Sequence, residues 1–200
     1  MSAERGVNVS FEIPDAPEAF ADLRWDAELS ERGLRRLVFS KVTKTKLSQP
    51  AVKLSHKQNR MLKKVKDALS ARLNGAQDDL DWSDFDLEPA GSFHLRVWRE
   101  LRKIPHGATA TYRDVAESAG SPLAYRACGQ ACGANRILIF IPCHRVVASG
   151  GIGGFGYGLG WKRTFLELER GIDLLNAPLE KRIVNKPKTP RRYSPSSLRI

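Results

Sequence analysis

The stretch "IPCHRVV", residues 141–147, places Cys143 between Pro142 and His144 in an otherwise apolar run. A buried cysteine usually behaves as a small hydrophobic side chain, whereas a thiolate is a nucleophile. A cation, a base or a helix N-terminus must lower a cysteine pKa from about 8.5 before the thiolate dominates at neutral pH. The run therefore indicates either a core residue or an activated nucleophile.

His144 is the nearest candidate base. The apolar run predicts an extended strand, on which consecutive side chains point to opposite faces. His144 would then act on Cys143 through a water molecule or a local twist, and it would need an acidic group to orient it. Glu169, in the amphipathic stretch "WKRTFLELERG", is the candidate for that third role.

Two other chemistries use the same residues. Cys128, Cys132, Cys143 and His144 offer four zinc ligands, but their spacing matches no paired-cysteine knuckle, and two adjacent ligands fit a tetrahedron poorly. A cysteine hydrolase would combine Cys143 and His144 with Asn135. Neither alternative accounts for the positive charge of the C-terminal half.

That charge is unevenly distributed. Residues 1–90 carry 15 basic and 15 acidic side chains, residues 91–175 carry 11 and 6, and residues 176–200 carry 7 and 1. A positive field of this kind attracts polyanions, of which nucleic acid is the most common. The charge alone is equally compatible with a merely basic protein.

The overall composition is that of a globular protein. The 200 residues suffice for one good core or two small ones, and no apolar stretch approaches the roughly 20 residues that span a bilayer. The N-terminus lacks the apolar core of a signal peptide, and three cysteines confined to one segment suit a reducing compartment. We expect a soluble protein of the cytoplasm, or of the nucleus in a eukaryote, with no membrane partner.

The N-terminal half reads as a small sheet and one helix. Residues 23–41 alternate as two strands around a turn at residues 30–33, which predicts a hairpin. Residues 55–75 place leucine and valine at helical spacing between a serine cap and a glycine stop. The acidic stretch 76–91 then connects two halves, with a boundary near residue 90.

The second half reads as mainly helical. The spacing in residues 92–104 predicts one amphipathic helix that closes before Pro105. Two short helices follow within residues 111–120 and 122–135, separated by a tight turn at residues 120–122. This is the outline of a helix-turn-helix, although paired helices also fill many all-α cores.

Small side chains dominate the second helix of that pair. Arg126 stands beside a smooth face that includes Ala127, Gly129, Ala131 and Gly133. Such a face permits close approach to another helix or to a nucleic-acid groove. The arginine and the basic surroundings favour the groove.

Together these motifs resemble the O6-alkylguanine-DNA alkyltransferases, also called methylated-DNA-protein-cysteine methyltransferases. "IPCHRVV" resembles the active-site signature of that family, and "YRACGQACGAN" resembles its recognition helix. The similarity runs in register over residues 85–171, including "GGFGYGLGWKRTFLELERG" as the closing loop and helix. Residues 1–84 are compatible with the variable N-terminal domain of the family.

The resemblance implies an α+β fold. A small antiparallel-sheet and helix domain would occupy residues 1–84, and a mainly helical catalytic domain with a helix-turn-helix would occupy residues 85–175. Residues 176–200 would form a basic, flexible tail. The implied activity is single-turnover transfer of the alkyl group from O6-alkylguanine in DNA to Cys143, and acceptance of O4-alkylthymine stays open.

The resemblance also assigns roles to residues around the cysteine. Cys143 would be the nucleophile and alkyl acceptor, with His144 as a base acting through water and Glu169 polarising the histidine. Asn135 would organise the active-site turn. Tyr112 would give a proton to the departing guanine.

Further residues would hold the DNA. Arg126 would fill the space left by a flipped nucleotide while the small face of its helix enters the minor groove. The backbone of Val146, with Tyr157 and Lys162, would line the base pocket. The implied partner is double-stranded DNA containing O6-alkylguanine, bound by a monomer without a metal or other cofactor.

Two features set this chain apart from its possible relatives. Arg136 follows Asn135, where the family usually has proline, which puts the geometry of the asparagine in question. The alkyltransferase-like proteins bind alkylguanine without accepting the alkyl group, but they lack the cysteine that is present here. A non-catalytic lesion-binding module is therefore the alternative from a different functional class.

Overall fold

The computed structural model describes residues 6–42 and 52–170, so the predicted tail at residues 176–200 lies outside the described residues. The chain forms two compact units. The first contains the described residues up to Pro89 together with the segment 136–140, and the second contains residues 90–135 and 141–170. The domain limits at residues 84 and 175 stay predictions.

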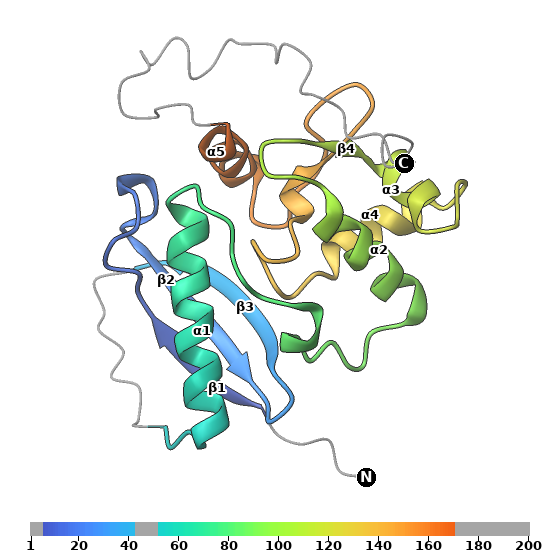
Figure 1. The fold of residues 1–200 in the computed structure, drawn as a ribbon. Helices are drawn as coiled ribbons and strands as arrows, with labels where there is room; N and C mark the ends of the chain where they lie inside the picture. The colour runs from blue at the N-terminus through green and yellow to red at the C-terminus, as the bar shows by residue number, and fades with distance from the viewer. Residues whose placement is uncertain (1–5, 43–51, 171–200) are drawn as a thin grey trace. The chain divides into compact units, whose positions relative to one another are not determined.

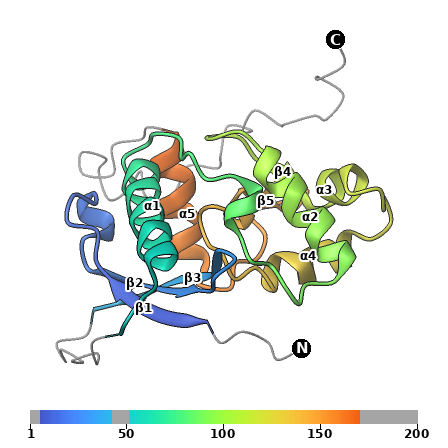
Figure 2. The same cartoon turned by 60° about the horizontal axis from the view of Figure 1, so that its bottom comes forward.

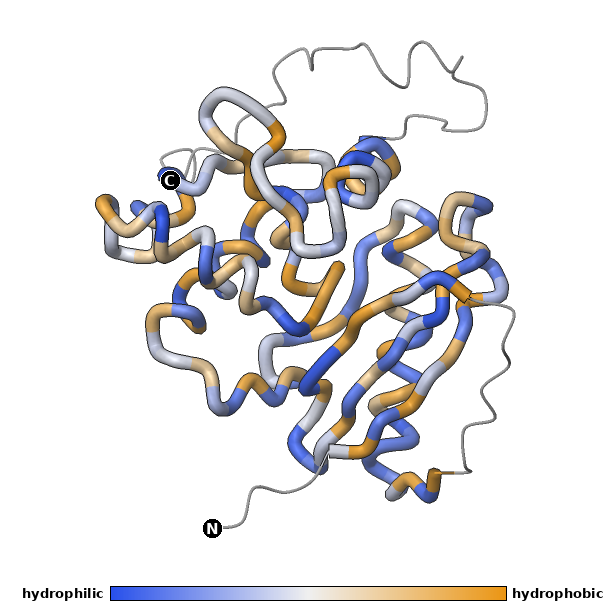
Figure 3. The backbone as a smooth tube through the Cα atoms, turned by 180° about the vertical axis from the view of Figure 1, so that it is seen from behind, coloured by the Kyte–Doolittle hydropathy of each residue, from blue (hydrophilic) through white to orange (hydrophobic). Residues whose placement is uncertain are grey.

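The first unit is built on a three-stranded antiparallel sheet. Strands β1 (Val7–Phe11), β2 (Leu23–Leu29) and β3 (Leu34–Lys41) pair in the order β1-β2-β3. Every second residue of β2 is buried, and Figure 3 shows hydrophobic and hydrophilic residues alternating along the strands. The predicted hairpin of β2 and β3 is confirmed.

Helix α1 (His56–Leu73) lies across this sheet (Figure 1). Ser55 and Gln58 form a capping box that satisfies the first amide groups of the helix. Val65, Leu69 and Leu73 are buried on its inner face, as their spacing predicted. Short 3₁₀ turns, η1 (Glu18–Phe20) and η2 (Trp82–Asp84), complete the regular structure of the unit.

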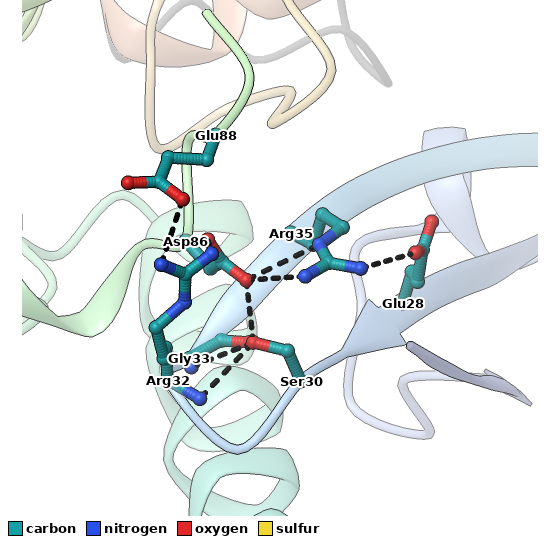
Figure 4. A network of polar contacts seen from close by, with 7 residues as sticks. All are labelled: Glu28, Ser30, Arg32, Gly33, Arg35, Asp86 and Glu88. Carbon is teal, nitrogen blue, oxygen red and sulfur yellow. Dashed lines mark hydrogen bonds and ion pairs between the residues drawn. The ribbon is translucent and has the colours of Figure 1, made fainter. Parts of the chain in front are cut away.

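The buried carboxylate of Asp86 binds side chains of the β2–β3 hairpin (Figure 4). Asp86 accepts hydrogen bonds from the Ser30 hydroxyl at 2.6 Å and from Arg35 Nη2 at 2.7 Å, and Arg32 Nη2 lies 3.0 Å from its other oxygen. Burial raises the pKa of Asp86, but the bonds from Ser30 and Arg35 outweigh burial and leave it below its usual value. The residues leading out of the unit are therefore held to the β2–β3 turn by a charged, fully satisfied contact.

The segment 136–140 runs beside β3 in parallel. The Leu37 amide donates to the Arg136 carbonyl at 2.8 Å, and the Leu138 amide donates to the Leu37 carbonyl at 3.0 Å. Ile137, Leu138 and Phe140 are buried. The chain thus inserts five residues into the first unit between two stretches of the second.

The second unit is mainly helical (Figure 2). Helices α2 (Ser92–Lys103), α3 (Tyr112–Ser118) and α4 (Tyr125–Gly133) pack on one another, and the predicted helices are confirmed. Strands β4 (Ala110–Thr111) and β5 (Val146–Val147) pair in parallel. The turn η3 (Cys143–Arg145) precedes β5, and helix α5 (Leu159–Glu169) ends the described chain.

Candidate active site

Cys143 begins a 3₁₀ turn, which corrects the expectation of an extended strand at this position. The Cys143 amide donates to the Ile141 carbonyl at 2.8 Å, and the Arg145 amide donates to the Pro142 carbonyl at 3.0 Å. The extended conformation begins only at Val146. In a 3₁₀ turn successive side chains are about 120° apart, so the strict opposition of neighbours on a strand does not apply to Cys143 and His144.

Asn135, two residues after the end of α4, holds this turn. Its Nδ2 donates to the Ile141 carbonyl at 2.7 Å and to the Cys143 Sγ at 3.2 Å. The amide therefore fixes both the backbone ahead of the cysteine and the sulfur itself. The structure brings Asn135 and Cys143 into contact, and it does so with Arg136, not proline, directly after the asparagine.

The Cys143 thiol is buried, with 7% of its surface exposed. Burial raises its pKa, while the hydrogen bond from Asn135 and the positive charge of Lys162 work in the opposite direction. The net shift is upward. At neutral pH the sulfur is therefore mostly protonated, and a nucleophilic reaction needs a base to remove the proton.

His144 and Glu169 make the contact that the sequence only suggested. His144 Nε2 lies 2.7 Å from Glu169 Oε1, and both side chains are buried. Burial is the largest effect on His144 and lowers its pKa, although Glu169 opposes it, so the imidazole is neutral at pH 7. A neutral ring that donates from Nε2 to a carboxylate keeps Nδ1 unprotonated and able to accept a proton.

Glu169 is also bound by Arg145, a residue that was not predicted from the sequence to take part in the site. Arg145 Nη2 donates to Oε1 at 2.7 Å and Nε donates to Oε2 at 2.9 Å, while the Gly107 amide donates to Oε2 at 3.1 Å. Burial raises the pKa of Glu169, but hydrogen bonds and charge from His144 and Arg145 bring it well below its usual value. The carboxylate is ionised and its charge is balanced by a buried arginine.

Arg145 is almost fully buried and donates from Nη1 to the Ile104 carbonyl at 2.7 Å. Buried arginines are rare unless they are paired. An arginine inside the apolar run "IPCHRVV" was therefore a signal in the sequence that a buried carboxylate lay opposite.

Lys162 is completely buried on α5. Its Nζ donates to the Val146 carbonyl at 2.5 Å and to the Gly154 carbonyl at 2.9 Å. Burial lowers its pKa to about 8, against the attraction of nearby cysteine sulfurs. The lysine thus joins α5 to β5 and to the glycine-rich segment 148–158.

Tyr112 meets the same segment from the start of α3. Its hydroxyl donates to the Gly154 carbonyl at 3.4 Å. Burial raises the pKa of this phenol, so the proton stays on the oxygen well above neutral pH. Gly153 has φ +72°, and a Cβ built there would lie 3.1 Å from the Tyr112 ring. The same Cβ would lie 3.0 Å from the Ala148 amide nitrogen, so a side chain at Gly153 would crowd both the backbone and the tyrosine.

The predicted DNA-contacting residues of α4 fall into two groups. Arg126 and Gly133 are exposed, and Ala127 and Gly129 are half-buried. Ala131 is fully buried, and its carbonyl accepts a hydrogen bond from the Trp98 indole at 2.8 Å. This corrects the expectation that Ala131 shares the exposed face, because that position faces α2.

Tyr157 lies at the surface of the segment between β5 and α5. It is 37% exposed, and its ring lies 6.0 Å from that of Phe155. Val146 is buried and offers its carbonyl to Lys162. The buried polar cluster therefore contains Cys143, His144, Asn135, Glu169 and Lys162, whereas Arg126 and Tyr157 are surface residues.

The described residues contain no group of three or more His, Cys, Asp or Glu side chains placed to hold a metal ion. Two of the four side chains considered as zinc ligands have other partners: His144 binds Glu169, and Cys143 accepts a hydrogen bond from Asn135. In the same described parts of the chain, no helix is long and apolar enough to cross a membrane.

Known proteins share this arrangement of sequence and fold. A family model for the 6-O-methylguanine DNA methyltransferase, DNA binding domain, matches residues 92–171. The probable methylated-DNA-protein-cysteine methyltransferase of Acanthamoeba polyphaga mimivirus is 42% identical over 111 residues, which cover 54% of this chain and 74% of the relative. The methylated-DNA-protein-cysteine methyltransferase of Methanosarcina barkeri is 39% identical over 142 residues, covering 70% and 86%.

A solved structure is also similar to this chain in its fold. The crystal structure of Mycobacterium tuberculosis OGT in complex with DNA superposes with a TM-score of 0.64 at 29% identity, covering 88% of this chain and 97% of that one. The similarity in sequence extends over most of two relatives, and the similarity in fold extends over both units. This chain therefore belongs to the family of methylated-DNA-protein-cysteine methyltransferases.

Proposed function

We propose that this chain repairs DNA by moving the alkyl group of O6-alkylguanine onto the sulfur of Cys143. The observation that carries the proposal is one buried thiol whose sulfur accepts a hydrogen bond from Asn135 and which is followed in the chain by a buried histidine paired with a carboxylate. The membership of the family supplies the reaction class.

The base acts through a water molecule. The thiol proton of Cys143 passes through that water to Nδ1 of His144, and the ionised Glu169 stabilises the imidazolium that forms. The thiolate then attacks the alkyl carbon in line with the carbon–O6 bond. That bond breaks as the sulfur–carbon bond forms, and its electron pair leaves with the guanine.

The leaving group needs a proton, because a guanine anion leaves poorly. Tyr112 supplies it, since burial keeps its phenol protonated. Lys162 shapes the pocket by holding the Val146 and Gly154 carbonyls, and the second lone pair of the Val146 carbonyl accepts from the guanine amino group. Tyr157, at the surface of the segment between β5 and α5, covers the outer side of the bound guanine.

Helix α4 docks in the minor groove of duplex DNA. The nucleotide must leave the stack to reach the thiol, at a cost of a few kcal/mol. Arg126 fills the vacated space, and the small residues Ala127, Gly129 and Gly133 allow close approach of the helix backbone. Residues 1–84 form the N-terminal domain and residues 85–175 form the catalytic domain of a monomer.

Each protein chain carries out the reaction only once. An S-alkylcysteine is a thioether, and water does not displace the thiolate from it as it does from an acyl-enzyme. The alkyl group passes directly from oxygen to sulfur, so neither a metal nor an organic cofactor is needed. The acceptor is consumed with each lesion.

The test is to incubate the full chain with a duplex oligonucleotide that carries one O6-methylguanine. We expect one methyl group on the tryptic peptide that contains Cys143, no transfer to Cys143→Ala, and normal transfer to Cys128→Ala as the matched control. Binding of the damaged duplex without any methylated peptide would instead identify a lesion-binding module. Repeated turnover of an ester would identify a hydrolase.

A further inference from the structure

Leu123, just before α4, is the most exposed of the large apolar side chains in the described residues. It is 93% exposed, against 47% for Val42, the next in order. Tyr125, two residues further on, is also exposed. Single apolar side chains are common on protein surfaces, so their exposure alone assigns no role. The backbone that holds Leu123 and the residues around it decide whether it has one.

A rigid turn presents Leu123 to the solvent. The Ala124 amide donates to the Ser121 carbonyl at 2.9 Å, so Pro122 and Leu123 are the two central residues of a β-turn. The proline ring fixes its own φ at about −65°. Among the described residues other than glycine, only Ile139 has a positive φ, so that of Leu123 is negative and the turn is type I. The position of Leu123 is therefore set by the backbone.

The same turn aligns Leu123 with Arg126. The Cys128 amide donates to the Ala124 carbonyl at 2.8 Å, so α4 begins directly where the turn ends. The central residues of a type I turn have dihedral angles close to those of a helix. Residues three apart in helical geometry leave the backbone on one side. Leu123 and Arg126 therefore project from the same side at the start of α4.

Tyr125 lies against Arg126. The Arg126 Cζ is 5.9 Å from the centre of the Tyr125 ring, within the range of a cation–π contact. Arg126 is exposed, and a long exposed side chain samples many rotamers unless a neighbour restrains it. The ring therefore favours the conformations in which the guanidinium stays over Tyr125, at the start of α4.

This end of α4 continues to the residues of the candidate active site. Gly129 follows Tyr125 by four residues and Arg126 by three, so it is their neighbour on one face of the helix. A Cβ built on Gly129 would lie 3.9 Å from the Tyr112 ring. A nucleotide whose base lay beside Tyr112 would therefore leave the duplex next to Tyr125 and Arg126.

The charge around Leu123 identifies a suitable partner. Residues 119–136 contain two arginines and no acidic side chain. DNA presents negatively charged phosphates outside and apolar base faces inside, which suits an apolar side chain on a positively charged surface. Proteins that bind the minor groove often insert leucine or another apolar side chain between two base pairs and so unstack them. Leu123 has the residue type, the exposure and the rigid backbone that such an insertion requires.

We propose that Leu123 inserts between base pairs beside the flipped nucleotide, while Tyr125 directs Arg126 into the space that the nucleotide leaves. This inference rests on the proposed function of α4 in the minor groove. Extrusion exposes base faces that were stacked, and burial of the leucine side chain against them offsets part of that cost. Leu123 is then a residue for recognition of the duplex, separate from the chemistry at Cys143.

The experiment compares single-turnover methyl transfer from O6-methylguanine in a duplex and in the same oligonucleotide as a single strand, which has no base-pair stack to open. At protein concentrations below saturation, we expect Leu123→Ala to react about tenfold more slowly with the duplex. Tyr125→Ala should also be slower with the duplex, and both variants should keep the wild-type rate with the single strand. Tyr125→Phe, which keeps the ring, and Val42→Ala, which removes exposed apolar surface from the first unit, should match the wild type with both substrates.

A fluorescent base separates this inference from the proposed function. 2-Aminopurine placed next to the lesion brightens when it is unstacked, and this signal needs no methyl transfer. We expect saturating wild type and Val42→Ala to raise the fluorescence equally, and Leu123→Ala to raise it much less. Unstacking by the wild type without methylated Cys143 would overturn only the proposed transfer. Wild-type fluorescence with Leu123→Ala would overturn the insertion, as would a wild-type rate of that variant on the duplex or equal slowing on the duplex and the single strand.

Discussion

Glu169 is the residue that balances the buried charges of the active site. It accepts hydrogen bonds from Arg145 and from the Gly107 amide, and it pairs with His144 at 2.7 Å. A buried ion pair is costly to break, because the remaining charge has no solvent to replace its partner. The same carboxylate therefore serves both the stability of the unit and the orientation of the base.

Replacing Glu169 with Gln is expected to lower the free energy of unfolding by about 3–5 kcal/mol, because it leaves Arg145 charged and unpaired. Methyl transfer should also slow, since His144 loses the charge that stabilises its protonated form. Asp67→Asn is the control: it breaks an exposed pair with Lys63 and should cost no more than about 1 kcal/mol. Urea unfolding that gives equal losses for the two variants would contradict this role.

The lowered pKa of Lys162 predicts how the stability of the fold changes with pH. Its pKa is about 8 in the fold against 10.5 for an unperturbed lysine, so the unfolded chain binds more protons between these values. The stability of the wild type should therefore rise relative to Lys162→Met across this interval, by up to about 1.4 kcal/mol per pH unit. Urea unfolding of both proteins at several pH values between 7 and about 10 tests this; a constant difference would show that the lysine is not held at a lowered pKa.

Among the loops between elements, two glycines with positive φ allow the energetic cost of backbone strain to be compared with the cost of crowding by neighbouring atoms. Gly153 has φ +72° and lies against Tyr112, whereas Gly75 has φ +82° and open space around its Cβ position. Alanine at Gly75 should cost about 1–2 kcal/mol for its conformation alone.

Alanine at Gly153 should cost more than alanine at Gly75 and should also slow methyl transfer, because its Cβ crowds the Ala148 amide and the Tyr112 ring. Thermal unfolding and single-turnover rates of the two variants check this expectation. Equal stability and equal activity of Gly153→Ala and Gly75→Ala would contradict it.

The elements with strong local signals were predictable. Helix α1 has a capping box and regular spacing, and the β2–β3 hairpin has alternating residues and a glycine turn. The turn at Cys143 was not, because the apolar run "IPCHRVV" reads as a strand while its conformation is set by Asn135 from another element. Arg145 was missed for the same reason: its partner, Glu169, lies 24 residues away.

In the whole molecule, the chain passes between the two units more than once. Residues 136–140 belong to the first unit, although they lie between α4 and the active-site turn. Sequence patterns are local, so they gave a single boundary near residue 90 and no sign of this insertion. The catalytic residues on either side of it are thus joined by a strand-like segment that pairs with β3.

A fragment of residues 85–175 should therefore be less stable than the full chain. It would expose Ile137, Leu138 and Phe140, and each buried apolar side chain contributes about 1.5–3 kcal/mol. Hydrogen exchange and unfolding of the fragment against the full chain measure this loss. Equal stability would show that the catalytic unit folds without β3.

The basic charge predicts salt-dependent binding to DNA. Arg126→Ala should weaken binding to duplex DNA and reduce the slope of log affinity against log salt by about 1. Arg36→Ala is the control, since that arginine is also exposed but lies on the sheet of the first unit. Equal slopes for the two variants, measured by fluorescence anisotropy, would remove Arg126 from the DNA contact.

The most direct measurement is a balance of methyl groups under an excess of duplex oligonucleotide carrying O6-methylguanine. Liquid chromatography counts the guanines restored, and peptide mass spectrometry counts the S-methylated Cys143. We predict that the two numbers stay equal and stop at one per chain. Restored guanine in excess of methylated Cys143, or methyl groups found on another residue, would contradict it.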